Sequence, residues 1–143
     1  MSRKLLFLKV PIIVLLLTQL LLVSCARKAH FVTSTVVPVA EGKVKVKKDK
    51  NNNYAINIKV RNLAEPNRLQ VPKDVYVVWA ETDRNGVQNL GQLKTSSGLF
   101  SSKMKASLET AIPYKPIRVF ITAEDDAAIQ YPGNFVVLNT NTF

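Results

Sequence analysis

Two short segments that alternate apolar and polar residues constrain the fold of this chain more than any other feature. Residues 42–48, GKVKVKK, place valines on one face and lysines on the other if the backbone is extended. Residues 54–61, YAINIKVR, repeat the pattern with tyrosine, isoleucine and valine on the apolar face. The intervening residues 49–53, DKNNN, have the composition of a turn that tolerates left-handed backbone angles. The pattern therefore predicts an antiparallel hairpin with one buried face.

The apolar residues also indicate how the two strands pair. If the valines and isoleucines of both strands point into one core, Val46 can lie opposite Ile58. In the same register Val44 lies opposite Val60, and the loop is centred on Asn52.

On the outer face, this register brings positive charges together. Lys45 faces Lys59. Lys43 in turn faces Arg61, and like charges directly opposite one another are mildly destabilising. The cationic ridge is the most distinctive surface feature that the sequence predicts. It consists of Lys43, Lys45, Lys47, Lys59 and Arg61.

The rest of the chain after residue 62 also has the composition of strands and turns. Residues 75–82, VYVVWAET, form a near-continuous run of β-branched and aromatic residues and give the strongest strand signal. Further strands are predicted at residues 87–94, 99–110, 116–124 and 134–140. About seven short strands at intervals of roughly 8 to 12 residues are typical of an all-β antiparallel sandwich, with a barrel as the alternative.

The N-terminal segment has a different composition and is considered separately from the domain. Residues 2–9 carry three positive charges and no acidic residue, and residues 10–23 are apolar except for two polar side chains. This pattern indicates a cleaved secretory signal peptide, because the apolar run is shorter than the ~20 residues that span a bilayer. Counted from Leu5 to Val23, the run nearly reaches that length, so an uncleaved signal anchor is the alternative.

The only cysteine of the chain follows this apolar run directly. The junction residues are Leu22, Val23, Ser24 and Cys25. They resemble the lipobox of bacterial lipoproteins, in which the cysteine is acylated and becomes the first mature residue. The resemblance implies a signal peptide at residues 1–24 and a lipidated tether at residues 25–30. The strand pattern then assigns residues 31–143 to the β-sandwich domain.

The same resemblance implies where the protein is held. Several acyl chains on Cys25 would anchor it permanently, because each buried methylene contributes about 0.8 kcal/mol and stable anchoring needs more than one chain. In enteric bacteria the residue after the lipidated cysteine influences sorting, and Ala26, unlike aspartate, favours the outer membrane. We therefore expect a lipid-anchored protein of the cell outer membrane that faces the periplasm.

The cationic ridge has two interpretations in that compartment. It can bind phosphate-bearing lipid headgroups, lipopolysaccharide or an acidic protein partner through charge complementarity. Lysines on a strand can also keep a solvated face soluble and discourage association between sheet edges. We expect no nucleic-acid binding, because the compartment does not suit it and the ridge lacks interleaved aromatic residues that stack on bases.

No group of residues has the pattern of a catalytic or metal site. Trp79, in the strongest strand, is expected in the core rather than as a platform that stacks on a ligand. Glu124, Asp125 and Asp126 lack the spacing of a calcium loop and are expected to form a solvated turn. His30, the only histidine, has no cysteine or second histidine to share a zinc ion. We therefore expect a protein that is not an enzyme and needs no cofactor or metal.

Two stretches of the chain have a distinctive pattern: residues 76–93, YVVWAETDRNGVQNLGQL, and residues 117–138, IRVFITAEDDAAIQYPGNFVVL. They resemble an immunoglobulin-like module of bacterial envelope proteins. More distantly, they resemble the extracytoplasmic domain of anti-sigma factors of the sigma-K regulator type. An anti-sigma factor also carries a cytoplasmic domain and a transmembrane helix before the sandwich, so we expect no sigma-factor binding by this chain. The resemblance implies an immunoglobulin-like fold and brings no catalytic residues.

Together these patterns predict a membrane-anchored envelope lipoprotein that acts as a non-catalytic binding or structural module. Its expected partners are the membrane, through the lipid anchor, and an anionic lipid headgroup or an envelope protein. In the alternative hypothesis, one edge of the sandwich pairs with a strand of a partner in an envelope complex. Salt separates the two hypotheses, because only the charge-driven contact weakens steeply as ionic strength rises.

Overall fold

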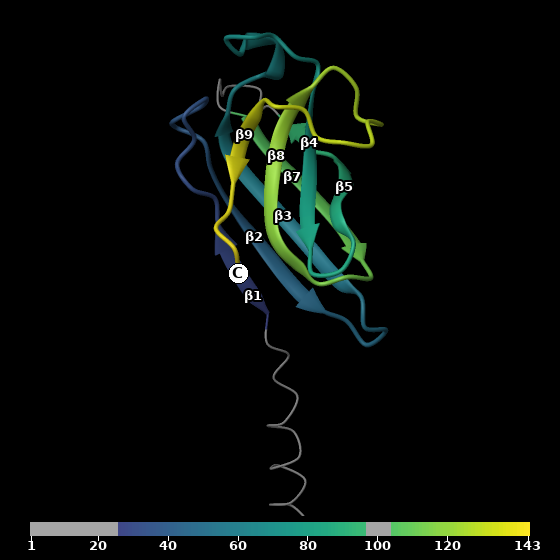
Figure 1. The fold of residues 1–143 in the computed structure, drawn as a ribbon. Helices are drawn as coiled ribbons and strands as arrows, with labels where there is room; N and C mark the ends of the chain where they lie inside the picture. The colour runs from purple at the N-terminus through teal and green to yellow at the C-terminus, as the bar shows by residue number, and fades with distance from the viewer. Residues whose placement is uncertain (1–25, 97–103) are drawn as a thin grey trace, which may run out of the picture.

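Over residues 26–96 and 104–143, which the computed structural model describes, the chain forms nine β-strands in two antiparallel sheets (Figure 1). The strands of the first sheet are β1 (Arg27–His30), β2 (Glu41–Lys48), β3 (Tyr54–Leu63), β6 (Lys94–Ser96) and β7 (Met104–Ile112). Those of the second sheet are β4 (Val75–Thr82), β5 (Gly86–Gln92), β8 (Pro116–Glu124) and β9 (Val136–Asn139). One turn of 3-10 helix, Pro66–Arg68, lies between β3 and β4.

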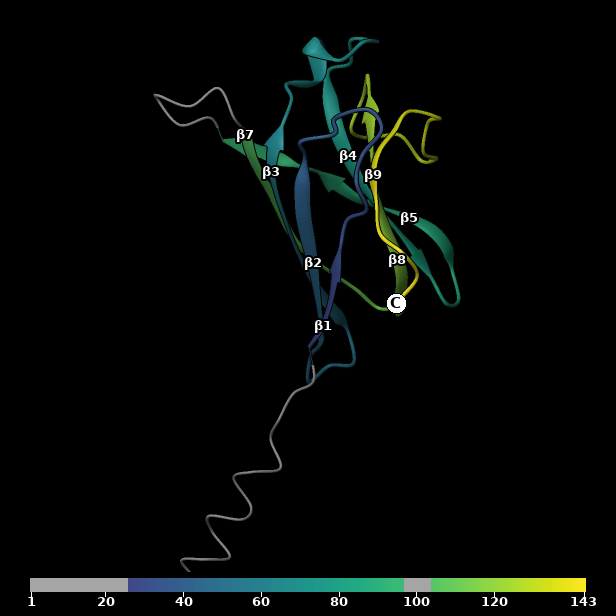
Figure 2. The ribbon, with the colours of Figure 1, turned by 90° about the vertical axis from the view of Figure 1, so that its left-hand side faces the viewer.

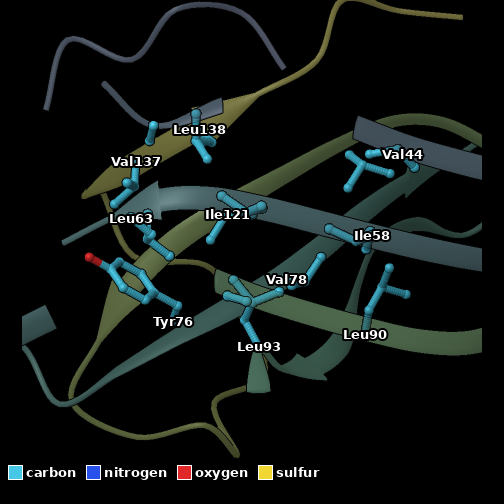
Figure 3. Close-up of a cluster of buried hydrophobic side chains, with 14 of the residues drawn as sticks. Val44, Ile58, Leu63, Tyr76, Val78, Leu90, Leu93, Ile121, Val137 and Leu138 are labelled. Carbon is cyan, nitrogen blue, oxygen red and sulfur yellow. The ribbon is translucent and has the colours of Figure 1, made fainter. Parts of the chain in front are cut away.

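The two sheets pack face to face around one hydrophobic core (Figure 3). Alternate residues of β2 and β3, among them Val44 and Ile58, point into this core and are almost fully buried. Tyr76, Val78 and Ile121 approach from β4 and β8 of the second sheet. Because each buried valine or isoleucine contributes about 1.5–3 kcal/mol, the period-two alternation of the sequence is what holds the layers together.

The strand order is that of an immunoglobulin-like sandwich. In that fold, strands A, B, E and D form one sheet, while C, F and G, with C′ added in some members, form the other. In the first sheet, whose order is β1-β2-β3-β7-β6, the strands β2, β3, β7 and β6 take positions A, B, E and D. β1 is an extra strand beside β2. The order β5-β4-β8-β9 fills positions C′, C, F and G. The predicted antiparallel immunoglobulin-like sandwich is therefore confirmed.

Leu93 marks the point where the chain leaves one sheet and joins the other. The predicted strand at residues 87–94 is divided here into β5, which pairs with β4, and β6, which pairs with β7. The side chain of Leu93 is buried, and its N–H donates to the carbonyl of Tyr76 at 2.9 Å. One continuous extended segment thus closes this side of the sandwich.

The segment after β1 closes the other side of the sandwich, which faces the viewer in Figure 2. Phe31 forms an antiparallel bridge with Thr140, which follows β9. The N–H of Val32 donates to the carbonyl of Asn139 at 2.8 Å. Chain crossings therefore join the two layers on both sides, although the strands divide into two sheets and do not form one barrel.

The expected tether at residues 25–30 is not a separate segment in the described part of the chain. Arg27–His30 form β1, which pairs in register with β2 from Arg27 opposite Val46 to His30 opposite Lys43. The expected start of the domain at residue 31 therefore moves to the beginning of β1. Four polar or small residues give no alternating signal, which is why the sequence pattern did not reveal this strand. The signal peptide predicted at residues 1–24 and Cys25 lie outside the described residues.

The predicted hairpin forms, but the strand pairing predicted from the sequence was shifted by two residues from the observed one. Val44 lies opposite Ile58, and Val46 lies opposite Ile56. The loop decides this register, because the carboxylate of Asp49 accepts hydrogen bonds from the backbone N–H groups of Asn51 at 2.8 Å and Asn53 at 2.9 Å. Asn52, between them, has the left-handed φ of 65° that asparagine tolerates. A shift of two leaves every side chain on its predicted face, so alternation alone could not detect it.

Trp79 is fully buried, as expected, but outside the core between the sheets. Tyr76, Val78 and Ala80 belong to that core, so Trp79 points to the opposite face of β4. There it stacks on Phe120, with ring centroids 6.4 Å apart and 16° between the planes.

This second cluster is closed by the loop between β8 and β9. Ala127 and Ile129 of the loop pack against it. The indole N–H of Trp79 donates to the hydroxyl of Thr122 at 2.8 Å, so the buried polar atom is satisfied. The sequence could not show that a loop rather than the facing sheet would cover this side of the strand.

Tyr76 offers a test of the core, because its hydroxyl donates to the carbonyl of Ala64 at 2.9 Å and burial raises the pKa of its phenol above the ordinary 10.0. We expect Tyr76→Phe to lower the free energy of unfolding by about 1 kcal/mol near neutral pH. Above a pH of about 10 the phenol ionises in the unfolded chain first, so the contribution of Tyr76 to stability declines. Urea unfolding of both proteins across this range should show a narrowing difference, and a constant difference would contradict the assignment.

Candidate anion-binding site

The outer face of the sheet formed by β1, β2, β3, β7 and β6 is strongly basic. Because the valines and isoleucines of β2 and β3 point into the core, the residues between them project outward and are exposed. The cross-strand register adds cations from β1, β6 and β7 to the same face. We define the basic face by its eight cations: Lys28, Lys43, Lys45, Lys47, Lys59, Arg61, Lys94 and Lys105.

One row of residues crosses the whole basic face. Lys43 lies directly opposite Lys59, and His30 lies opposite Lys43 on the other side. Farther along the row, Ser107 separates Lys59 from Lys94. Directly opposite residues in antiparallel strands have Cβ atoms about 4.5–5.5 Å apart, so Lys43 and Lys59 form a close pair of like charges.

Both acidic residues of this face form hydrogen bonds with side chains other than the lysines. Oε2 of Glu41 accepts hydrogen bonds from Nε and Nη2 of Arg61 at 3.0 Å and 2.8 Å. On the neighbouring row, Glu109 accepts a hydrogen bond from the side-chain amide of Asn57. All ten acidic residues of the chain lie within the described ranges, and none forms an ion pair with a lysine of the basic face.

The structure therefore corrects the predicted cationic ridge. The sequence placed Lys43 opposite Arg61, whereas Arg61 lies opposite Glu41 and forms an ion pair with it. Lys45 was expected opposite Lys59 but faces Asn57. Lys28, Lys94 and Lys105 join the basic face instead. They were missed because β1 and β6 gave no strand signal, and because the sheet order that aligns β7 with β3 cannot be read from alternation.

Two adjoining shallow hollows lie on the basic face. The first has a volume of about 490 Å³ and is lined by Lys43, Lys59 and Lys105 together with the hydroxyl-bearing Ser96 and Ser107. Glu41 also lines it, with its charge paired to Arg61. The second shares His30, Lys43 and Lys59 with the first and extends toward Lys28, Lys45 and Lys47. Ammonium and hydroxyl groups are suitable donors for phosphate or carboxylate oxygens, so the hollows can hold anionic groups.

The three consecutive acids after β8 do not form a common site. Oε1 of Glu124, whose residue is buried rather than solvated as expected, accepts from the N–H of Gly133 at 2.8 Å. Asp125 pairs with Lys73 at 2.7 Å, and this hydrogen bond raises the pKa of the Lys73 ammonium. Asp126 accepts from the N–H of Ala128 at 2.9 Å. Among the described residues, no group of three or more histidine, cysteine, aspartate and glutamate side chains could hold a metal ion.

Comparisons of the chain with protein-family models, with curated proteins and with solved structures found no match. Within residues 26–96 and 104–143, no helix is both long and apolar enough to cross a membrane. Cys25, the predicted site of lipidation, precedes the first described residue.

The opposed lysines provide a direct test of the observed register. Lys43→Glu places a carboxylate opposite Lys59, so we expect the free energy of unfolding to rise by about 0.2–1 kcal/mol. The gain should be lost in a Lys59→Gln background and should weaken at high salt, as denaturant unfolding in a double-mutant cycle would measure.

Lys45→Glu is the matched control, because it reverses the same charge one row away, opposite Asn57. In the register expected from the sequence, this residue would face Lys59. A stronger coupling to Lys59 from position 45 than from position 43 would contradict the observed pairing.

Proposed function

We propose that this chain is a lipoprotein of the cell envelope, held through an acylated Cys25 on the periplasmic side of the outer membrane. Its β-sandwich acts as a non-catalytic module that binds an anionic partner through the basic face. The lipobox-like junction at residues 22–25 supports the anchor. The opposed Lys43 and Lys59, for which the described residues provide no ion pair, carry the binding part of the proposal.

The arrangement of charges favours binding over a purely solubilising role. Lysines that only keep a surface solvated gain nothing from lying directly opposite one another, and that placement costs stability. An anion placed between Lys43 and Lys59 would replace this repulsion with two attractions. The neighbouring Lys94 and Lys105 extend the same field across the sheet.

Assembly by strand addition is the second candidate function. β1 is the edge strand of its sheet, with β2 as its neighbour, so its other edge can accept a strand of a partner. Backbone hydrogen bonds would hold such a complex, and their strength depends little on ionic strength. Salt dependence therefore distinguishes this candidate from an anionic partner at the basic face.

The anchor is tested by the intact mass of the protein from the membrane fraction, measured beside that of Cys25→Ala. We expect the wild-type chain to begin at Cys25 and to carry acyl chains, and we expect the variant to lack both features. An unmodified wild-type chain that begins near Met1 would show a signal anchor and would contradict the lipoprotein proposal.

The binding part is tested with inorganic polyphosphate as an anionic probe. A cation at an anionic surface contributes about 1 kcal/mol, so Lys43→Gln/Lys59→Gln should weaken binding by about 30-fold. Arg68→Gln/Arg118→Gln removes the same charge outside the basic face, at cations already paired with Glu65 and Glu81, and should have a much smaller effect. Titrations at rising ionic strength should show steep weakening for the wild type, and equal affinity of both double variants would contradict the assignment of the site.

A further inference from the structure

The end of the sandwich where β1 begins lies directly beside the proposed anchor. β1 starts at Arg27, so Ala26 is the sole residue between this strand and Cys25. Two residues of extended chain reach about 7 Å. The headgroup layer of each leaflet is about 5–7 Å thick. An acylated Cys25 at the top of the hydrocarbon layer therefore holds this end of the domain among the headgroups.

A small hollow at this end combines cations with apolar side chains. Arg27, Lys48 and Lys115 contribute positive charge, and Val46, Tyr54 and Phe143 contribute apolar surface. The ammonium of Lys48 lies 5.7 Å from the centre of the Tyr54 ring. The hollow thus offers donors for a phosphate beside a surface suited to the glycerol part of a phospholipid.

Further cations surround this hollow. The β2–β3 loop, the β4–β5 turn and the β7–β8 turn gather at the same end, seen at the bottom of Figure 1. They add Lys50 and Arg84 to the three cations of the hollow, while Asp49 and Asp83 are the acids there. The Asp49 carboxylate is already occupied by two backbone N–H groups. Tyr114, in the β7–β8 turn, is partly exposed and is of the type found at membrane interfaces.

Two loops at the opposite end of the sandwich are acidic in their described residues. Its β3–β4 and β8–β9 loops are joined by the ion pair of Lys73 with Asp125. The described residues of these two loops and the adjoining strand ends contain five acids and two cations. The acids are Glu65, Asp74, Glu124, Asp125 and Asp126, and the cations are Arg68 and Lys73. Among the described residues, the cations beside Cys25 therefore form a positive end, and the two acidic loops form a negative end.

From this polarity we infer that the Arg27–Lys48–Lys115 end docks onto anionic phospholipid headgroups of the leaflet that holds Cys25. The sandwich then stands end-on, and its negative end points away from the anionic surface. This inference rests on the proposed function for the anchor and adds the lipid class and the orientation.

An end-on orientation leaves the part of the basic face around Lys43 and Lys59 free, whereas Lys28 and Lys47 lie beside the docking end. Lys43 lies five residues before Lys48 along β2, which corresponds to about 16 Å of strand. That distance exceeds the thickness of the headgroup layer. Lys43 and Lys59 then lie in the aqueous compartment, where they can bind a second anionic partner.

The orientation can be measured with the full chain reconstituted in vesicles that contain an acceptor-labelled lipid. Asn85→Cys places a donor fluorophore in the β4–β5 turn, and Tyr131→Cys places it in the β8–β9 loop at the other end. In vesicles of equal parts phosphatidylcholine and phosphatidylglycerol, we expect the donor at position 131 to lie about 30 Å farther from the bilayer, given strands of nine residues. In phosphatidylcholine alone this difference should shrink.

Two charge-matched variants locate the contact. Lys48→Gln/Lys115→Gln should abolish the distance difference in the anionic vesicles, whereas Lys43→Gln/Lys59→Gln should preserve it. The thermal midpoints of both variants, compared with that of the parent, confirm that each is folded. If the donors are equally distant from the bilayer, or if only the Lys43 and Lys59 variant changes the distances, the sandwich lies on its basic face and the inference is overturned.

The number of labels per chain separates this result from a failure of the anchor. An acylated Cys25 has no free thiol, so each variant should take up one label. Two labels would show an unmodified Cys25 and would overturn the lipoprotein proposal. One label together with a wrong orientation would overturn the docking inference and leave the anchor intact.

Discussion

The alternation of buried and exposed residues in the β2–β3 hairpin is the constraint on which the rest of the structure depends. Each valine or isoleucine that this alternation places in the core contributes about 1.5–3 kcal/mol, whereas opposed like charges cost about 0.2–1 kcal/mol. Core burial therefore outweighs charge repulsion, and Lys43 must project beside Lys59 on the outer face. The same interaction that builds the sandwich also creates the basic face.

Much of the fold could be predicted from the sequence because period-two patterns survive in the folded chain. The faces of β2 and β3, the strong strand β4 and the all-β class follow from residue spacing. The hairpin register could not be predicted, because it depends on two hydrogen bonds to Asp49. β1 and β6 are short and exposed, so neither left an apolar signal. The predicted cationic ridge therefore lacked Lys28 and Lys94, which these two strands add to the basic face.

Charge and topology are linked in this molecule. The two chain crossings, at Leu93 and at Phe31, keep the sheets in register with each other at both sides. Loops consequently gather at the two ends of the strands. Among the described residues, one end is rich in cations, and the β3–β4 and β8–β9 loops at the other end are rich in acids. The sandwich thus presents three chemically distinct surfaces: a positive end, a negative end and a basic side. The second cluster around Trp79 fixes the β8–β9 loop, which forms part of the negative end.

The incorporation of Arg27–His30 into the first sheet also determines how the domain responds to mechanical force. Tension applied through the residues before β1 acts along the axis of that strand. The β1–β2 hydrogen bonds run across the strand direction, so such tension loads them together in shear rather than opening them one at a time. The crossing of Phe31 to Thr140 carries part of the load into the second sheet. The N-terminal strand is therefore a mechanically resistant part of the fold.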